Sequence, residues 1–209
     1  MSILNKFCST AVSIVICAST AQAHAANAVG FYIGGAAGQS HIRDNTSASG
    51  NISDSTNGWA ARAGIKPLPL IGVEVEYADF GSVKVSTTGL QAADYSLGVS
   101  SSAVFALLYV PNPVPKLDLI IKAGYSNTKR TKSGTWTTTL PGVGACVVGN
   151  PMCGTTTVSG KVSQTSSNVA YGAGLQFTLL KLVFRAEYER IHDTLGDPDM
   201  ATVGIALKF

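Results

Sequence analysis

The hydrophobic residues of this chain repeat with a period of two, in eight segments of about ten residues. A large apolar side chain at every second position is typical of a β-strand with one face in an apolar environment. The segments cover residues 29–40, 58–66, 71–80, 94–110, 117–127, 167–177, 182–191 and, after a short loop, the stretch that ends at 209. No helical period competes, so the sequence predicts an all-β protein.

The connections between the segments alternate in length. Three long polar connections alternate with three compact turns, at residues 41–57, 81–92 and 128–166 and at 67–70, 111–115 and 178–181 respectively. Barrels of the outer membrane have short periplasmic turns, longer external loops and an even number of strands. Their tilted strands need about 9 to 11 residues. We therefore predict an eight-stranded antiparallel up-and-down transmembrane β-barrel over residues 26–209.

The two faces of the segments differ in chemistry. One face carries large apolar side chains and hardly a charge. The other mixes small residues with charges of both signs, at Arg62, Glu74, Glu76, Asp118, Lys122, Arg185, Glu187 and Glu189. Large apolar groups would fill the interior of a water-soluble barrel, whereas a small polar face fits the narrow interior of eight strands. The apolar face then looks outward to lipid, and a periplasmic lipocalin-like or sandwich fold is the alternative.

The inward charges predict a salt-bridged interior. A lone charge in a narrow lumen is costly, so opposite charges on neighbouring strands should pair in a polar network that plugs the barrel. A narrow, porin-like channel for ions or small solutes is the alternative function of the same residues.

Aromatic residues predict two belts at the membrane surfaces. One belt lies toward the long loops and the other toward the short turns, with Trp59, Tyr77, Tyr95, Tyr125, Tyr171 and Tyr188 in the first and Phe31, Tyr109, Phe177, Phe184 and Phe209 in the second. The fourth strand has the weakest pattern, because residues 100–102 are all serine. We expect a bulge there to shift its register.

The first 25 residues predict a Sec-type signal peptide. Lys6 is the only charge before a short apolar stretch at residues 12–18, and small residues suit cleavage after Ala23 or Ala25. A membrane anchor is the alternative, but no stretch approaches the roughly 18 to 20 apolar residues that a spanning helix needs. Cleavage would leave Cys146 and Cys153, which we expect to form a disulfide in an oxidising compartment. A metal site at these cysteines is not expected, because no His, Asp or Glu lies near them in the sequence.

Three runs and the chain end resemble a known superfamily. They are Gly30–Gly35, Tyr171–Phe177, Arg185–Tyr188 and the terminal Phe209, and they are similar to outer-membrane β-barrels that include OmpA-type transmembrane domains and Opa-like surface antigens. The resemblance implies residence in the outer membrane of a Gram-negative bacterium. It also implies recognition of the last strand by the barrel-assembly machinery, through Val203, Ile205, Leu207 and Phe209. Leu207 stands where this signal commonly has an aromatic residue.

The third long loop is the candidate binding region. No Asp or Glu occurs between Asp118 and Glu187, and the loop carries cations and a tryptophan, at Lys129, Arg130, Lys132, Lys161 and Trp136. These residues suit the phosphates of lipopolysaccharide or acidic glycans of a host or the environment. The threonine-rich flanks, residues 135–139 and 155–159, predict a hairpin that extends beyond the membrane. We expect a monomeric surface protein with a structural and adhesive role.

The sequence gives little support to other functions. Only three histidines occur, and a lipid A-modifying enzyme would need a histidine, a serine and a carboxylate arranged toward the lipid. No His-x-Ser pair occurs, and His41 and His192 fit polar positions at strand ends. We therefore expect no enzyme activity and no cofactor. The formal net charge of +3 is too small to predict nucleic-acid binding.

Overall fold

The structure is a computed structural model that describes residues 30–44, 52–87, 91–111, 114, 116–139 and 155–209. The predicted signal peptide and the predicted disulfide between Cys146 and Cys153 lie outside these residues. Eight strands make up the described part: β1 (Gly30–Asp44), β2 (Ile52–Lys66), β3 (Ile71–Thr87), β4 (Gln91–Pro111), β5 (Leu117–Thr139), β6 (Thr155–Leu179), β7 (Leu182–His192) and β8 (Asp199–Lys208). Within it, no helix reaches the length and apolarity that crossing a membrane would require.

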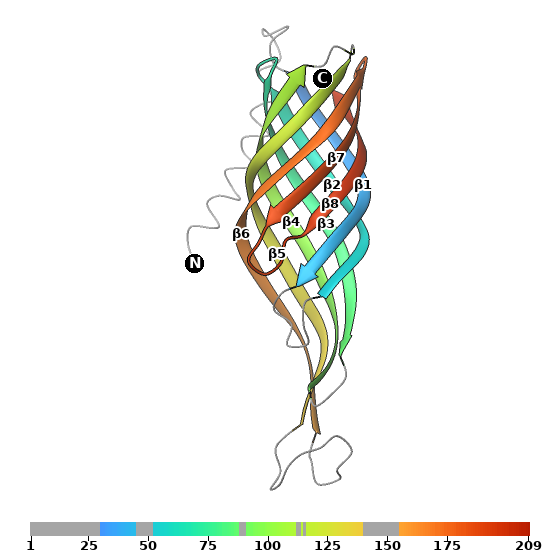
Figure 1. Ribbon diagram of the computed structural model, residues 1–209, viewed down its shortest axis with the longest axis vertical. Helices are drawn as coiled ribbons and strands as arrows, with labels where there is room; N and C mark the ends of the chain where they lie inside the picture. The colour runs from blue at the N-terminus through green and yellow to red at the C-terminus, as the bar shows by residue number, and fades with distance from the viewer. Residues whose placement is uncertain (1–29, 45–51, 88–90, 112–113, 115, 140–154) are drawn as a thin grey trace.

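Each strand pairs with its neighbour in the chain, and β1 pairs with β8 to close the barrel, as predicted (Figure 1). All pairings are antiparallel. The closure reaches the end of the chain, because the Phe209 N–H donates to the Phe31 carbonyl at 2.8 Å. A closed sheet leaves no unpaired strand edge in lipid, where each unsatisfied backbone group would cost several kcal/mol.

The strands run further toward the long loops than the hydrophobic pattern indicates. β5 and β6 have 23 and 25 residues and reach well beyond β7 and β8 (Figure 1). The predicted hairpin is confirmed, because Thr135 to Thr139 pair with Ser159 to Thr155. We call residues 82–87, 91–100, 128–139 and 155–168 the extension. Its threonine and serine residues lack apolar alternation, but threonine favours strands and the backbone ladder continues through them.

The predicted bulge lies in β3, not in the fourth strand. Two residues of β3, Phe80 and Gly81, stand opposite the single residue Val99 of β4, between the pairs Asp79–Ser100 and Ser82–Gly98. Gly81 has φ +81°, a conformation that glycine adopts without steric cost. The extra residue reverses which positions of β3 face inward, from Ala78 and Phe80 to Val83 and Val85.

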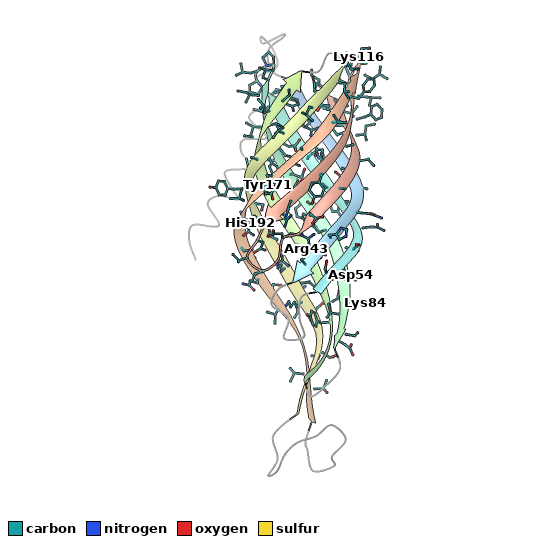
Figure 2. The ribbon with its side chains drawn as sticks, in the orientation of Figure 1. Arg43, Asp54, Lys84, Lys116, Tyr171 and His192 are labelled. Atoms are coloured by element: carbon teal, nitrogen blue, oxygen red, sulfur yellow. The ribbon has the colours of Figure 1, made fainter. Side chains whose placement is uncertain are left out.

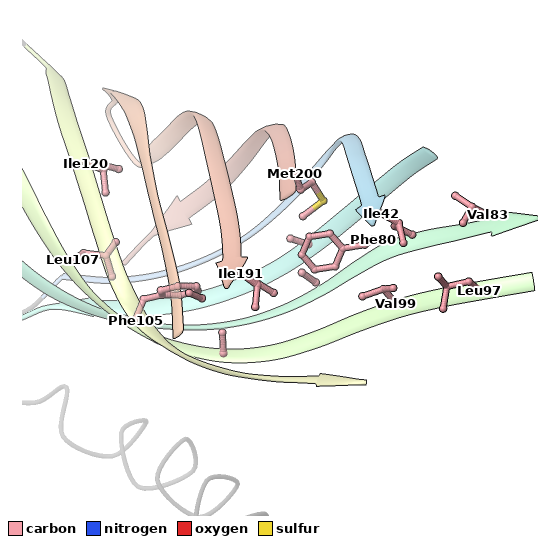
Figure 3. Close-up of a cluster of buried hydrophobic side chains, with 14 of the residues drawn as sticks. Ile42, Phe80, Val83, Leu97, Val99, Phe105, Leu107, Ile120, Ile191 and Met200 are labelled. Carbon is pink, nitrogen blue, oxygen red and sulfur yellow. The ribbon is translucent and has the colours of Figure 1, made fainter. Parts of the chain in front are cut away.

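Different kinds of side chain occupy the two ends of the barrel interior. Toward the long loops, apolar side chains from five strands pack together, at Ile42, Phe80, Val83, Leu97, Val99, Ile191 and Met200 (Figure 3). Toward the short turns, charged side chains share the lumen with the buried side chains of Phe105, Leu107, Tyr109 and Ile120. The outward face carries exposed apolar groups along every strand, as the sequence predicts.

The aromatic belts are confirmed except in β4 and at Phe31, which is half-buried. The exposed aromatic side chains toward the long loops are Trp59, Tyr77, Tyr125, Tyr171 and Tyr188, and those toward the short turns are Phe177, Phe184 and Phe209. The prediction for Tyr95 and Tyr109 is wrong, because both face the interior: Tyr109 is buried and Tyr95 packs against the apolar cluster. Regular alternation along β4 puts its odd-numbered residues inside, and the serine run had hidden this alternation in the sequence.

Candidate functional site

Seven charged side chains meet inside the barrel and form what we call the lumen network. They are Arg62, Glu74, Glu76, Lys122, Arg185, Glu187 and Glu189. Strand alternation on β2, β3, β5 and β7 directs all of them inward. Each is at most 7% exposed, so all seven are buried inside the lumen. The structure thus brings together seven of the eight inward charges that the sequence singled out.

Lys122 is the centre of the network. Its Nζ lies 2.7 Å from Oε2 of Glu189 and 3.1 Å from Oε2 of Glu76. The same ammonium lies 3.4 Å from Oε2 of Glu187 and 4.0 Å from Oε1 of Glu74. One lysine therefore links carboxylates of β3 and β7 across the barrel.

The two arginines complete the cross-barrel pairing. Arg62 Nη2 lies 3.3 Å from Oε2 of Glu76, and its Nη1 donates to Oε2 of Glu187. Arg185 Nη1 donates to Oε2 of Glu74, and its Nε lies 3.4 Å from Oε1 of Glu187. Because every charge has an opposite partner, the cost of taking each one out of water is offset by its neighbours.

Two polar side chains extend the network and were not included in the prediction. Tyr32 donates its hydroxyl to Oε2 of Glu74 at 2.6 Å, and Gln176 accepts from Nε of Arg185 at 3.1 Å. A Cβ at Gly64 would lie 2.3 Å from the Tyr32 ring, so only glycine leaves room for it. The inward direction of Tyr32 could have been predicted from the sequence, because strand alternation puts Tyr32 on the same face of β1 as the small inward residues.

The carboxylates of the network surround a cation that belongs to the chain itself. Oxygens of Glu74, Glu76 and Glu187 lie within 4.8 Å of one another, close enough for three ligands of a metal ion. The Lys122 ammonium forms ion pairs with all three carboxylates, so it occupies the position that a metal ion would take. Asp118, the eighth predicted inward charge, lies near the start of β5, half-buried and outside these described ion pairs.

Arg130 ties the extension to the rim of the barrel. Its Nε lies 3.1 Å from Oδ2 of Asp193, and its Nη1 donates to the Arg43 carbonyl at 2.9 Å. Its Nη2 donates to the Gly196 carbonyl. The side chain is 4% exposed. Arg130 therefore holds the loop after β7, and its guanidinium has no surface to offer a ligand.

The other predicted lysines lie on two faces of the extension. Lys161 and Lys129 are exposed on its outer face. Lys84 of β3, which is labelled in Figure 2, is exposed on the same face. Lys132 lies on the inner face, where its Nζ is 5.5 Å from the centre of the Tyr95 ring. Trp136 stands in β5 opposite Val158 of β6.

A comparison with protein families finds one match, described as outer membrane protein beta-barrel domain, over residues 9–209. The chain belongs to this family. It is an outer-membrane β-barrel protein, and the exposed apolar side chains of its strands are its lipid-facing surface.

Several solved structures have the same fold as this chain. Ail, the attachment invasion locus protein of Yersinia pestis, has a TM-score of 0.54 and 18% identity over 87% of this chain and 99% of that one. Neisserial surface protein A has a TM-score of 0.53 and 17% identity, with 86% and 97% covered. OprG of Pseudomonas aeruginosa has a TM-score of 0.53 and 13% identity, with 87% and 96% covered. A comparison with curated proteins finds no match.

The outer-membrane barrel also assembles a polar cluster that the sequence concealed. His41 of β1 pairs with Ser55 of β2 on one side and with Asp199 of β8 on the other. The Ser55 Oγ lies 2.9 Å from Nε2 of His41, and Oδ1 of Asp199 lies 3.8 Å from its Nδ1. Arg43 Nη2 lies 3.2 Å from the other oxygen of Asp199. A search for His and Ser close in sequence could not find this cross-strand arrangement.

Proposed function

We propose that this outer-membrane barrel binds a polyanionic glycan through the outer face of its extension. The observation that carries the proposal is a row of residues in register across four strands: Lys84 of β3, Ser96 of β4, Ser133 of β5 and Lys161 of β6. The two lysines stand at the ends of the row, three strand spacings apart. At about 4.8 Å per spacing, the separation is roughly 14 Å.

Lys129 adds a third cation on the same face, four residues along β5 from Ser133 toward the barrel. We call Lys84, Lys129 and Lys161 the cationic face. Hydroxyl residues lie between them and can donate hydrogen bonds to sulfate or carboxylate oxygens. Asp94 lies on the same face, two residues from Ser96 along β4 and further from the barrel. It is the one acidic residue among the described residues of this face. Repeating anionic groups on a flexible chain suit cations spaced in this way.

The alternative occupant is the lipopolysaccharide of the cell's own membrane, for which Lys129 is best placed because it lies closest to the barrel. Lys84 and Lys161 lie further out along the strands, which favours a ligand outside the membrane. The structure of Ail that resembles this chain was solved in complex with the heparin analogue sucrose octasulfate. Its low identity supports only the choice of a sulfated glycan as the first probe.

The test is binding of the refolded full-length barrel to immobilised heparin, compared with neutral dextran. We expect the double variant Lys84→Glu/Lys161→Glu to lose roughly tenfold or more in affinity, because exposed ion pairs contribute about 0.2 to 1 kcal/mol each and each reversal also adds repulsion. The matched control is Lys116→Glu/Lys181→Glu, which changes the net charge equally at the short turns (Figure 2).

The control variant should bind heparin as well as the original protein. Equal losses in both variants would show a dependence on net charge alone and would contradict the proposal. Deletion of residues 133–160 removes Ser133 and takes Lys161 out of its register with Lys84. It should therefore weaken binding while the barrel still inserts, and full binding by the deletion variant would also contradict the proposal.

A further inference from the structure

We propose that Ser55, His41 and Asp199 form a hydrolytic site for acyl esters of outer-leaflet lipids. The site lies on the outward face of the barrel, at the extracellular end of β1, β2 and β8. It is separate from the cationic face and does not depend on the glycan-binding proposal.

The geometry of the three residues is that of an acyl-transfer triad. With Nδ1 of His41 protonated toward Asp199, the unprotonated Nε2 accepts a hydrogen bond from the Ser55 hydroxyl at 2.9 Å. The Asp199 contact, at 3.8 Å, is an ion-pair distance rather than a hydrogen bond. Hydrogen bonds of catalytic groups are often long without substrate and shorten in the complex. Asp199 is 6% exposed, whereas His41 and Ser55 are open to the outside.

The backbone register holds this arrangement in place. His41 stands directly opposite both Ser55 and Asp199, so the three side chains lie side by side on one face of adjacent strands. Directly opposite residues of antiparallel strands have Cβ atoms about 4.5 to 5.5 Å apart, which suits hydrogen bonds between short side chains. Three strands of a closed barrel therefore orient the serine, the base and the carboxylate.

The height of the site on the barrel corresponds to the polar region of the outer leaflet. Trp59 and Tyr77 pack with ring centroids 5.6 Å apart in the extracellular aromatic belt. Ser55 lies four residues along β2 from Trp59, on the same face and on the loop side. On β7, Tyr188 of the same belt pairs with Ala201, two residues from Asp199. Aromatic belts mark the headgroup level, where the ester groups of lipids begin.

A groove on the lipid-facing surface lies next to the site. Its volume is about 640 Å³, and alanines from four strands, Ala37, Ala173, Ala186 and Ala201, make it concave between larger groups such as Tyr188 and Val203. Gln39 and Ala201 also line it, and they form the outward pair next to His41 and Asp199 along β1 and β8. An apolar groove in lipid beside a polar triad fits an acyl chain whose ester lies at the polar end.

The chemistry needs water and no other co-reactant. Nε2 of His41 takes the Ser55 hydroxyl proton as Oγ bonds to the ester carbonyl carbon, and it then gives that proton to the leaving alkoxide oxygen as the ester C–O bond breaks. His41 next takes a proton from water, whose oxygen bonds to the acyl carbon, and returns it to Oγ as the acyl-serine bond breaks. The products are a free fatty acid and a lipid with one acyl chain fewer.

Two neighbouring residues have supporting roles. Asp199 is a positioning residue, because it orients His41 and does not touch the ester. Arg43 follows His41 by two residues on the same face of β1, and its guanidinium is a cation that can stabilise negative charge on the ester oxygen. Its contact with Asp199 holds it beside the triad.

The experiment incubates the refolded full-length barrel with mixed micelles in H₂¹⁸O and measures fatty-acid release by mass spectrometry. One arm contains diacylphosphatidylglycerol and the other purified lipid A, which distinguishes the two lipid sources. We expect release in at least one arm, with one ¹⁸O in the fatty acid. Ser55→Ala and His41→Gln should each lower it by roughly a hundredfold or more.

The matched control is Ser53→Ala, the same substitution two residues away on the same exposed face of β2. It should leave fatty-acid release unchanged. Asp199→Asn should lower kcat with little change in KM, and it should slow labelling of Ser55 by a fluorophosphonate. Heat-dependent mobility on a denaturing gel checks that each variant still forms the barrel.

Absence of release in both arms would overturn the proposal. Release that survives Ser55→Ala would also overturn it, because the activity would then come from a contaminating hydrolase. Release abolished equally by Ser53→Ala would show damage to the sheet rather than loss of a nucleophile.

Discussion

The interior of the barrel contains two regions that are built in different ways. The charged half, toward the short turns, holds the lumen network, with three cations and four glutamates. The apolar half, toward the long loops, holds the part of the cluster around Phe80 and Leu97 (Figure 3). Both regions are almost fully buried. Stability in the charged half depends on the matching of charges, whereas in the apolar half it depends on how completely side chains fill the volume.

The largest expected effect comes from leaving one buried charge without its partner. Arg185→Met removes the partner of Glu74 and should lower the free energy of unfolding by roughly 3 to 5 kcal/mol. Glu74→Met should act similarly. The double variant should cost less than the sum of the two, because it leaves fewer unpaired groups. Urea unfolding of the refolded barrel, followed by tryptophan fluorescence, measures all three, and simple additivity would contradict direct pairing.

In the apolar half, Leu97→Ala should cost roughly 2 to 4 kcal/mol through lost burial and the cavity left behind. Leu108→Ala, on the lipid-facing side of the same strand, is the matched control and should cost less in the same urea experiment, because that side chain is already 46% exposed. Unlike the Arg185→Met effect, the Leu97 effect should not be relieved by any second substitution of a charged residue. Equal costs at both leucines would show that the interior near Leu97 is loosely packed.

A smaller effect distinguishes two glutamates within the charged half. Four carboxylates face three cations, so removing one negative charge balances the network. Oxygens of Glu187 contact Arg62, Lys122 and Arg185, whereas Glu189 pairs with Lys122. Glu189→Gln should therefore cost about 1 kcal/mol less than Glu187→Gln in urea unfolding. A greater cost at Glu189 would mean that its contact with Lys122 matters more than the charge balance.

The smallest effect concerns the rim, where the ion pair between Arg190 and Asp197 is only partly buried. Partial burial tends to raise the pKa of Asp197, but hydrogen bonds from Arg190, at 2.7 Å, and from the Asp193 N–H hold that pKa below its usual value. A lowered folded-state pKa gives stability that is present above the unfolded pKa, about 3.9, and is lost as pH falls through the folded value. The stabilisation that Asp197 adds over Asp197→Asn should thus be constant above about pH 5 and vanish in stronger acid.

The chemical shift of the Gly196 amide reports this loop, because its N–H donates to the Asp193 carbonyl at 2.9 Å. In the original protein it should move as the pH falls from 5 to 2, and in Asp197→Asn it should stay still. The same acid titration in both proteins would assign the change to another group.

Most of the architecture could be predicted from the sequence, because it depends on local alternation and on turn residues. The period of two placed Glu74 and Arg185 on one face, and their inward direction follows from that placement. The prediction failed where alternation was hidden or displaced. The serines at 100–102 concealed that Tyr95 and Tyr109 face inward. The bulge at Gly81 lies in β3, so the switch from even-numbered to odd-numbered inward residues occurs there and not in β4.

The candidate sites were predictable to different degrees. The charges of the lumen network were visible as a set, but their partners depend on which strands lie across the barrel. Arg130 looked like a surface cation, yet the loop after β7 folds over it and takes its hydrogen bonds. Lys84 was missed because it was placed in a loop, and the Ser55–His41–Asp199 cluster was missed because its members are far apart in the chain.

The sequence by itself determined the class of fold, the number of strands and the face of each strand that meets lipid, since these follow from a pattern that each segment carries alone. Only the tertiary structure decided the register between strands and the distances across the lumen. Both follow from closure of the sheet, which fixes how neighbouring strands pair. The sequence of a single strand carries no information about that pairing. The pairing of His41 with Ser55 and Asp199 is a product of that closure.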